Sequence, residues 1–577
     1  MGGFVVHAQL RRYRARKRLR PPHRAPCAEP VPLAVLSSPT VQHPNQRADA
    51  SATTRSRRRG GAVFVAAGIL LSRLAGLIRL QVFSHYFGLE SDAADAFNAA
   101  FRIPNFLQNL FGEGALSASF IPVYAALVAR SERKEADRVA GAVGALLALV
   151  VAVLVLAGVA ATPFLIDAIA PGFQGDKRQL TIELVRILFP GAGLLVLSAW
   201  CLGVLNSHHR FLLSYTAPVM WNAVMIATLV AFGPSSSLPR LATLLAWGSV
   251  VGSFVQFVVQ VPVVVRVAPD LRIALDLAST HVRTVAANFA PVFISRGVVQ
   301  VSAYIDALLA SLLPTGAVTG IANAQLLYTL PVSLFGMSVA AAELPSMSGE
   351  ASTDVQGQAL MRTRLDQGLR RIAFFVVPSA MAFLALGDVL VAALLQTGRF
   401  RHEDAVYVWG ILAGSSVGLL ASTLGRLYSS SYYALRDTKT PLRFAIVRVA
   451  LTTVLGYFFA LPLPRMLNVP QSWGAAGLTV SAGIAGWVEF VLLRRTMNAR
   501  IGRTGLPATY VMKLWTAAIA GAVVAWAVKL TIPVLAPAVA AVLIVIPYGL
   551  VFLLMALALR VDGAMTMIRM VVRRGAS

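Results

Sequence analysis

Charged residues are scarce in this chain, and cysteine is nearly absent. Only 13% of the 577 residues are charged, whereas 57% are hydrophobic. A soluble domain usually carries about 25% charged residues. The two cysteines, Cys27 and Cys201, are too few and too isolated for a disulfide framework or a thiolate metal site. His208 and His209 have no acidic or cysteine partner at metal-ligand spacing. The composition therefore predicts an integral membrane protein, and we expect neither a metal nor a cofactor.

Sequence motifs of common enzymes are also missing. The chain has no Walker loop and no G-x-S-x-G elbow. The longest inner loops that we predict, at about 266–283 and 348–369, are too small for a catalytic domain. These absences favour a transporter without its own ATPase over an enzyme.

The apolar segments predict an all-α polytopic membrane protein. Crossing a hydrocarbon core of about 30 Å requires about 20 apolar residues per helix. About 14 segments meet that length. The second is long, and we expect Pro104 and Pro122 to break it. The predicted segments are 62–84, 93–127, 139–168, 180–205, 211–232, 240–265, 284–311, 317–342, 370–395, 405–432, 442–462, 471–493, 508–531 and 536–559.

The basic residues outside these segments predict the orientation of the chain. With the N-terminus inside, roughly 23 Lys and Arg fall in inner connections and the C-terminal end, against 6 in outer connections. Such an excess marks the cytoplasmic side. We therefore expect both termini to be cytoplasmic.

The first 60 residues differ from the rest. They carry 13 of the 51 Lys and Arg, with runs at 11–20 and 55–59, and little hydrophobic periodicity. We predict a disordered basic tail over 1–60, held at anionic lipid headgroups. A start codon assigned too far upstream is an alternative, and a nucleic-acid-binding arm is disfavoured.

Two arginines, Arg73 and Arg79, lie inside the first apolar segment. An arginine near the middle of a bilayer costs about 2.5–3.5 kcal/mol on insertion scales, so both need a polar interior. They lie about 120° apart around the helix and about 9 Å apart along it, so they can border one wide cavity. A cationic cavity indicates a negatively charged ligand. For Arg79 the alternative is a side chain that extends toward the membrane surface.

Other polar residues at membrane depth are candidates for the same cavity. Asp95 could instead lie near the outer end of its helix and simply be solvated. Arg296 could instead form an internal ion pair that only fixes packing. Arg426 could equally reach toward the inner surface. Glu113 is deep enough to require a cation or a proton. The candidates identified by depth are Asp95, Arg102, Glu113, Arg296 and Arg426.

An internal repeat divides the chain. Ser72-Arg73 in the first segment matches Ser295-Arg296 in the seventh, and the next segment in each case contains proline, L-F-G, an acid and proline (103–123 and 330–347). Transporters built from repeats bind their substrate where the halves meet. We predict an N-lobe over 61–283, a C-lobe over 284–495 and a central cavity between these two six-helix lobes. Two further helices and a short basic tail would occupy 496–577.

Four motifs resemble the MurJ (MviN) family of lipid II flippases. They are SRLAGLIR (72–79), ADAFNAAFRIPNFLQNLFGEGALSASFIPVYAAL (94–127), APGF (170–173) and LRDTKTPLRFAI (435–446). The resemblance covers about residues 62–560. It implies fourteen helices, two six-helix lobes, an extra C-terminal pair and a cationic cavity. The implied activity is transfer of the lipid-linked peptidoglycan precursor to the outer leaflet of the bacterial cytoplasmic membrane, with a lipid-facing groove on the last helix pair for the tail.

The resemblance also implies site residues. Arg73 and Arg79 match the two arginines that the family needs for the diphosphate-sugar headgroup, and Asp95 matches its D-A-F acid. Pro104, Asn105, Glu113 and Gly114 match its helix-two signature, and Arg426 falls where it often has a basic residue.

The chain departs from the family at three places. Leu80 replaces an aspartate, Gln108-Asn109 replaces an arginine pair, and Asn323-Ala324-Gln325 replaces an A-D-R motif. We hypothesise that Arg102 and Arg296 supply the missing charge. The exact lipid-linked substrate, the coupling ion or use of membrane potential, and any cell-wall synthesis partners stay open. The alternatives are a flippase for another polyprenyl-diphosphate glycan, a drug exporter of the same superfamily, a membrane scaffold and a membrane-embedded transferase.

Overall fold

The computed structural model describes residues 68, 70–276, 278–349, 355–533 and 535–565. The predicted basic tail over 1–60 lies outside this range, as do the last basic residues of the chain. The side chains of Glu113 and Arg296 also lie outside the described residues, although the backbone at both positions is helical. Every regular element in the described ranges is helical. The predicted all-α class is therefore confirmed.

The helices fall into two halves, which we name by their order in the chain. The first half contains a helix at 70–87, α3 (Asp92–Phe111), α4 (Glu113–Ser119), α5 (Ile121–Ala129), α6 (Arg133–Ile169), α7 (Gly175–Ser207), α8 (Phe211–Phe232) and α9 (Leu238–Val267). The second half contains α10 (Thr280–Ser311), α11 (Ala317–Pro331), the π-helix η1 (Val332–Met337), α12 (Ser338–Gly349), α13 (Val355–Leu395), α14 (His402–Ala434), α15 (Lys439–Ala460), α16 (Pro462–Met466), η2 (Gln471–Trp473) and α17 (Gly474–Ile501). Two further helices, α18 (Ala508–Thr531) and α19 (Pro537–Ala558), follow.

Twelve helical segments of the described chain are long and apolar enough to cross a membrane. They correspond to twelve of the fourteen predicted segments. The other two, 62–84 and 284–311, correspond to the helix at 70–87 and to α10, which are not among the twelve. The count of fourteen therefore remains a prediction. Large apolar side chains such as Leu156, Phe164 and Leu554 are exposed, at 70%, 79% and 64%. This pattern suits helices whose outer faces contact lipid.

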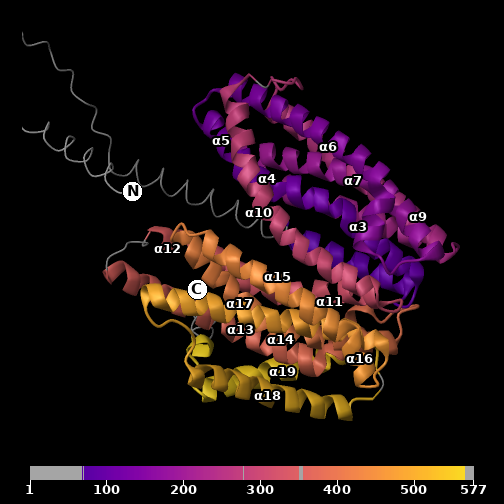
Figure 1. Cartoon of the computed structure of the whole chain (residues 1–577), viewed down its shortest axis with the longest axis vertical. Coiled ribbons are helices and arrows are strands. Elements are labelled where there is room, and N and C mark those ends of the chain that lie inside the picture. The colour runs from indigo at the N-terminus through magenta and orange to yellow at the C-terminus, as the bar shows by residue number, and fades with distance from the viewer. Residues whose placement is uncertain (1–67, 69, 277, 350–354, 534, 566–577) are drawn as a thin grey trace, which may run out of the picture. The chain divides into compact units, whose positions relative to one another are not determined.

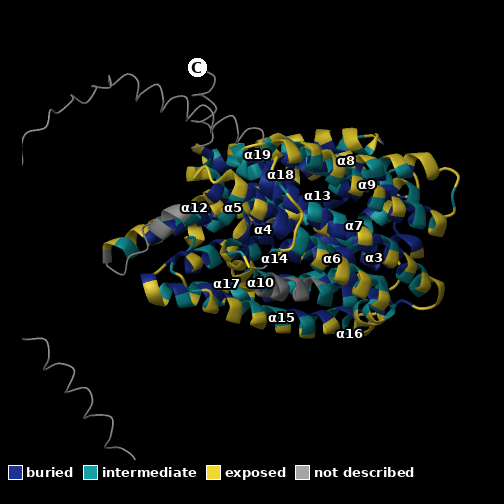
Figure 2. Ribbon diagram, turned by 90° about the horizontal axis from the view of Figure 1, so that it is seen from above, coloured by how far each residue is buried: buried dark blue, intermediate teal, exposed yellow. Residues whose placement is uncertain are grey.

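Each half has one helix that is surrounded by the others. In the first half α7 packs against α3, α6 and α9, and its small residues from Gly191 to Gly193 permit close approach. In the second half α14 packs against α11, α13 and α17. Figure 1 shows the two sets as separate groups of roughly aligned helices, coloured indigo to magenta and pink to orange. Figure 2 shows buried residues concentrated on α3, α7, α13 and α14.

The last two helices pack against the second half. Both α18 and α19 contact α13, and Ala522, Ile544 and Tyr548 form a small core with Leu386 and Val389. The Tyr548 hydroxyl donates to the carbonyl of Pro378 at 2.6 Å. A buried hydroxyl in a membrane bundle needs such a partner.

The L-F-G motifs of the internal repeat have different backbone structures. In the first copy α3 ends at Phe111, and Gly112 is extended (φ −78°, ψ −157°) before α4 begins. In the second copy the motif lies inside η1. The predicted break at Pro104 is wrong, because α3 continues through this residue. Proline removes only one backbone donor, and bundle packing retains the helix. Pro122 lies in the first turn of α5, directly after a helix boundary at Phe120.

The helix α10 packs on both halves. Near its start, Phe289 and Phe293 contact Phe111 of α3, with ring centroids 5.4 and 5.3 Å apart. Near its end, Leu309 and Ala310 belong to the core of the second half. Figure 1 shows α10 running along the boundary between the two groups of helices.

Candidate functional site

Arg73 joins the first helix to the π-helix of the second half. Its Nη1 donates to Ser333 Oγ at 2.7 Å. Ser333 in turn donates to the carbonyl of Leu330, at 3.1 Å. Arg73 is exposed, so most of its donors face open space. Among the described residues its hydrogen-bond partner is a neutral hydroxyl, which leaves the positive charge of the guanidinium uncompensated by this contact.

Arg79 points into the first half. Its guanidinium carbon lies 5.5 Å from the ring centroid of Phe101 and 5.1 Å from that of Trp221. The two rings are stacked on each other, with centroids 5.6 Å apart. Nη1 contacts the Met225 sulfur at 3.9 Å, and Nε is buried without a hydrogen-bond partner. Aromatic faces hold a cation without cancelling its charge.

No ion pair to either arginine is found among the described residues. Arg73 reaches across to the second half, whereas Arg79 is held by α3 and α8 of the first. The six-residue spacing predicted that the two side chains point in different directions from the helix. Their guanidiniums accordingly have different surroundings. The arrangement suits a ligand with more than one anionic oxygen, since planar guanidinium groups pair well with phosphate.

A second charged cluster lies where α3, α10, α15 and α17 meet. The Tyr304 hydroxyl donates to the backbone carbonyl of Arg102 at 3.1 Å. Asp306 interacts electrostatically with Arg102 and Arg448, and its Oδ1 is buried without a hydrogen-bond partner. Arg448 also pairs with Glu489 at 3.0 Å. Arg102 therefore lies within electrostatic range of an acid of the second half.

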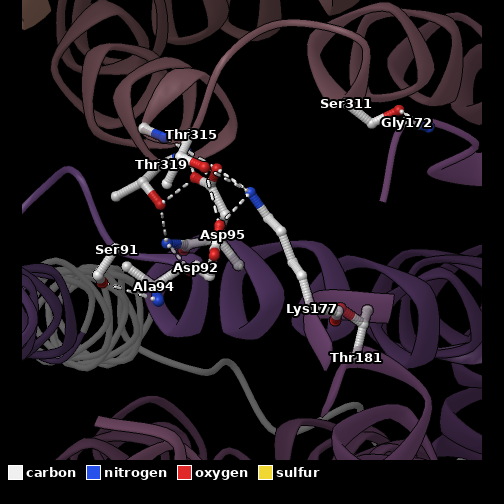
Figure 3. Close-up of polar contacts among 12 residues, drawn as sticks. Ser91, Asp92, Ala94, Asp95, Gly172, Lys177, Thr181, Ser311, Thr315 and Thr319 are labelled. Carbon is white, nitrogen blue, oxygen red and sulfur yellow. Dashed lines mark hydrogen bonds and ion pairs between the residues drawn. The ribbon is translucent and has the colours of Figure 1, made fainter. Parts of the chain in front are cut away.

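Asp95 has a different environment from the arginines, as Figure 3 shows. Its side chain is 1% exposed and accepts hydrogen bonds from the backbone N–H groups of Gly316 and Thr319, both at 2.9 Å. The Thr319 hydroxyl donates at 2.7 Å and Lys177 Nζ at 2.9 Å. Lys177 also pairs with Asp92 at 3.1 Å. Asp95 therefore caps the N-terminus of α11, where a carboxylate is stabilised by unpaired N–H groups. It fastens the first half to the second.

The remaining sequence-predicted residues lie on neighbouring faces. Asn105 is half-buried three residues after Arg102, on the same side of α3. Arg426 is exposed on α14, one turn beyond Ser422 and Thr423, which contact Tyr328 of α11 and Gly336 of η1. In the segment that replaces the family's A-D-R motif, Gln325 is exposed and contacts Thr329, whereas Asn323 is buried with no hydrogen-bond partner for its amide.

Several contact residues were not identified from the sequence. They are Ser333, Phe101, Trp221, Lys177 and Thr319. Lys177 was counted in the sequence only as one of the six basic residues in the predicted outer connections. The others come from segments far away in the chain, and no spacing rule links them to the arginines. A further acid, Glu343 of α12, lies 3.9 Å from Arg364 and 3.8 Å from Arg371.

Comparison with known proteins identifies the family. The sequence model of "Lipid II flippase MurJ" matches residues 83–559. The lipid II flippase MurJ of Burkholderia cenocepacia is 34% identical over 430 residues, which cover 74% of this chain and 80% of the relative. A probable lipid II flippase MurJ of Rhizobium meliloti is 30% identical over 529 residues, covering 89% and 96%.

Solved structures show the same fold. A lipid II flippase MurJ in an inward closed conformation superposes with a TM-score of 0.71 at 22% identity, covering 86% of this chain and 99% of that one. An inward-facing multidrug resistance transporter of the MATE family, from the MOP superfamily, gives 0.59 at 18% identity, covering 76% and 98%. The multi-pass helical architecture and the match over most of the sequence lead to one conclusion: this chain belongs to the MurJ family of lipid II flippases.

Proposed function

We propose that this protein moves lipid II from the inner to the outer leaflet of the bacterial cytoplasmic membrane, without chemical change to the lipid. The observation that carries the proposal is the state of Arg79. Its guanidinium is held by Phe101 and Trp221 with no carboxylate partner among the described residues, in a segment that the sequence predicts to cross the membrane. A membrane protein retains such a charge for a functional reason. The names of the relatives support lipid II as the substrate.

The proposed mechanism is alternating access. The diphosphate enters between the halves and takes donors from Arg73, which exchanges its neutral partner Ser333 for an anionic one. Arg79 contributes a second cation, while Arg102 is released from Asp306. Asn105, Arg426, Glu113 and Arg296 remain proposed members of the same site. The lipid tail stays in the bilayer, and the lobes 61–283 and 284–495 then rock about the site.

The contacts of Asp95 hold the two halves together at one end of the space between them. Opening that end requires Asp95 to release Lys177 and the N-terminus of α11. We propose that this end faces outward and that both termini are cytoplasmic, because basic residues are concentrated in the opposite connections. The same asymmetry assigns the predicted basic tail to the cytoplasmic side.

Complementation tests the proposal. A bacterium depleted of its own lipid II flippase would receive the wild-type chain, Arg73→Ala or Arg79→Ala, with membrane insertion measured for each. We expect growth with the wild type and none with either variant. A correctly inserted wild type that fails to restore growth would overturn lipid II as the substrate. Gln108 and Gln325 would then direct the search toward another polyprenyl-diphosphate glycan.

A further inference from the structure

The first half has a surface groove that shares no residue with the proposed site between the halves. It has a volume of about 860 Å³ and lies where α6, α7 and α9 meet. Figure 1 shows these three helices side by side in the indigo-to-magenta group, and the contacts of α7 with α6 and α9 agree. Its walls combine apolar residues with charged ones: Pro163, Ile182, Pro190 and Trp247 with Glu183 and Arg186.

Glu183 and Arg186 lie near the depth of lipid headgroups. The helix α7 has 33 residues and is therefore about 50 Å long, about 20 Å more than a hydrocarbon core. Glu183 and Arg186 lie about 12 and 16 Å from its first residue. With α7 centred on the core, their backbones lie about 2 and 6 Å inside the hydrocarbon boundary, and their long side chains can extend from there to the headgroups. Trp247 is 54% exposed beside them, as expected for an aromatic residue at that boundary.

Two charged residues of the groove, Glu183 and Arg186, have no ion-pair partner among the described residues. Arg178 at the rim is neutralised by Asp167 through contacts of 2.8 and 3.0 Å. Arg186 has no ion-pair or hydrogen-bond partner in the described part of the chain, and Glu183 contacts only the hydroxyl of Thr243 at 3.3 Å. Glu183 and Arg186 are three residues apart, so both point to the same side of α7. They are exposed, as is Pro190 one turn on.

We propose that this groove binds a phospholipid whose headgroup carries both a phosphate and a primary amine, as in phosphatidylethanolamine. Arg186 donates to the phosphate, and Glu183 accepts hydrogen bonds from the ammonium group. The acyl chains follow the apolar wall formed by Pro163, Ile182 and Pro190. An anionic headgroup would place its phosphate beside Arg186 and leave Glu183 unpaired. A trimethylated headgroup would give Glu183 no N–H donor.

Native mass spectrometry of the detergent-purified full chain tests this site without any transport assay. The probes are phosphatidylethanolamine, phosphatidylglycerol and phosphatidylcholine with identical acyl chains. We expect about five-fold stronger retention of phosphatidylethanolamine than of either other lipid, the range of one exposed charge pair. Equal retention of the three lipids, or preference for either of the others, would overturn the proposal.

Two variants and a control make the test specific to the groove. Glu183→Gln should shift the preference to phosphatidylglycerol, because Arg186 then acts alone. Arg186→Gln should weaken retention of all three lipids by about five-fold. Arg240→Gln, at the start of α9 outside the groove, should change nothing. Because all three side chains are exposed, the variants should fold. Groove variants that retain lipids as Arg240→Gln does would overturn the assignment.

Discussion

The two halves hold their charges differently where they meet. In the first half, Arg79 lies beside two stacked aromatic rings and Arg73 contacts a hydroxyl, so neither charge is cancelled by an acid among the described residues. In the second half, Arg448 pairs with Glu489, and Arg371 lies beside Glu343. Arg73 and Arg79 of the first half therefore keep their charges available for an anion, whereas Arg371 and Arg448 of the second half already have acidic partners. We therefore propose that the first half contributes most to recognition of the substrate.

The strongest test removes one charge from each half. Arg79→Met keeps most of the side-chain volume beside Phe101 and Trp221 but removes the donors. We expect transport to fall by about 100-fold, since two charge-assisted hydrogen bonds are lost. Arg448→Met should instead lower stability by about 1 kcal/mol, because Glu489 is left without its partner.

Lipid transfer in proteoliposomes and thermal unfolding of the same preparations would measure both effects. Transport by Arg79→Met at the wild-type rate would contradict the comparison of the halves. So would an Arg448→Met variant that is as stable as the wild type but inactive.

Asp95 is an exception to this difference between the halves. It is an acid of the first half that stabilises a helix of the second, α11. Asp95→Asn should cost about 3 kcal/mol of stability, since Lys177 loses a charged partner and the N-terminus of α11 loses an anion. The double variant Asp95→Asn/Lys177→Met should lose less than the sum of the single variants. Thermal unfolding of the four proteins measures the coupling. Strict additivity would show that the two side chains act separately.

The two L-F-G motifs allow a smaller structural test. A Cβ at Gly112 would lie 2.2 Å from the backbone oxygen of Gln108, and a Cβ at Gly336 would lie 2.4 Å from the Thr423 methyl. Gly112→Ala should therefore destabilise the protein by about 2 kcal/mol and Gly336→Ala by about 1 kcal/mol. Adding Thr423→Ala should restore the stability of the Gly336→Ala variant but not that of the Gly112→Ala variant. Rescue of both, or of neither, in unfolding measurements would contradict this difference.

The smallest effect concerns Ser333. Ser333→Ala removes a neutral acceptor from Arg73 and should change transport by less than five-fold, the range of an ordinary hydrogen bond. Ser333→Thr keeps the hydroxyl and provides the control. The assay is again lipid transfer in proteoliposomes. A loss as complete as that of Arg73→Ala would place Ser333 among the residues that contact the substrate.

The sequence predicts the helices well because membrane thickness limits their length. Each predicted apolar segment corresponds to a helix, although the count of fourteen crossings is not confirmed. The Pro104 break was wrong because neighbouring helices retain a helix that has lost one donor. The residues that contact the site residues could not be predicted from the sequence. Trp221 lies 142 residues after Arg79, and Thr319 lies 224 residues after Asp95. Charge at membrane depth indicates that a partner is needed but does not identify it.

The position of α10 has a mechanical consequence. Its beginning is packed with Phe111 of the first half and its end with the core of the second. Any rotation of one half against the other must therefore bend this helix or detach one of its ends. Pro291 lacks a backbone N–H and lowers the resistance to bending near the first contact. The stiffness of a single helix would thus enter the rate of every transport cycle, and a residue outside the proposed substrate site could limit the speed of the protein.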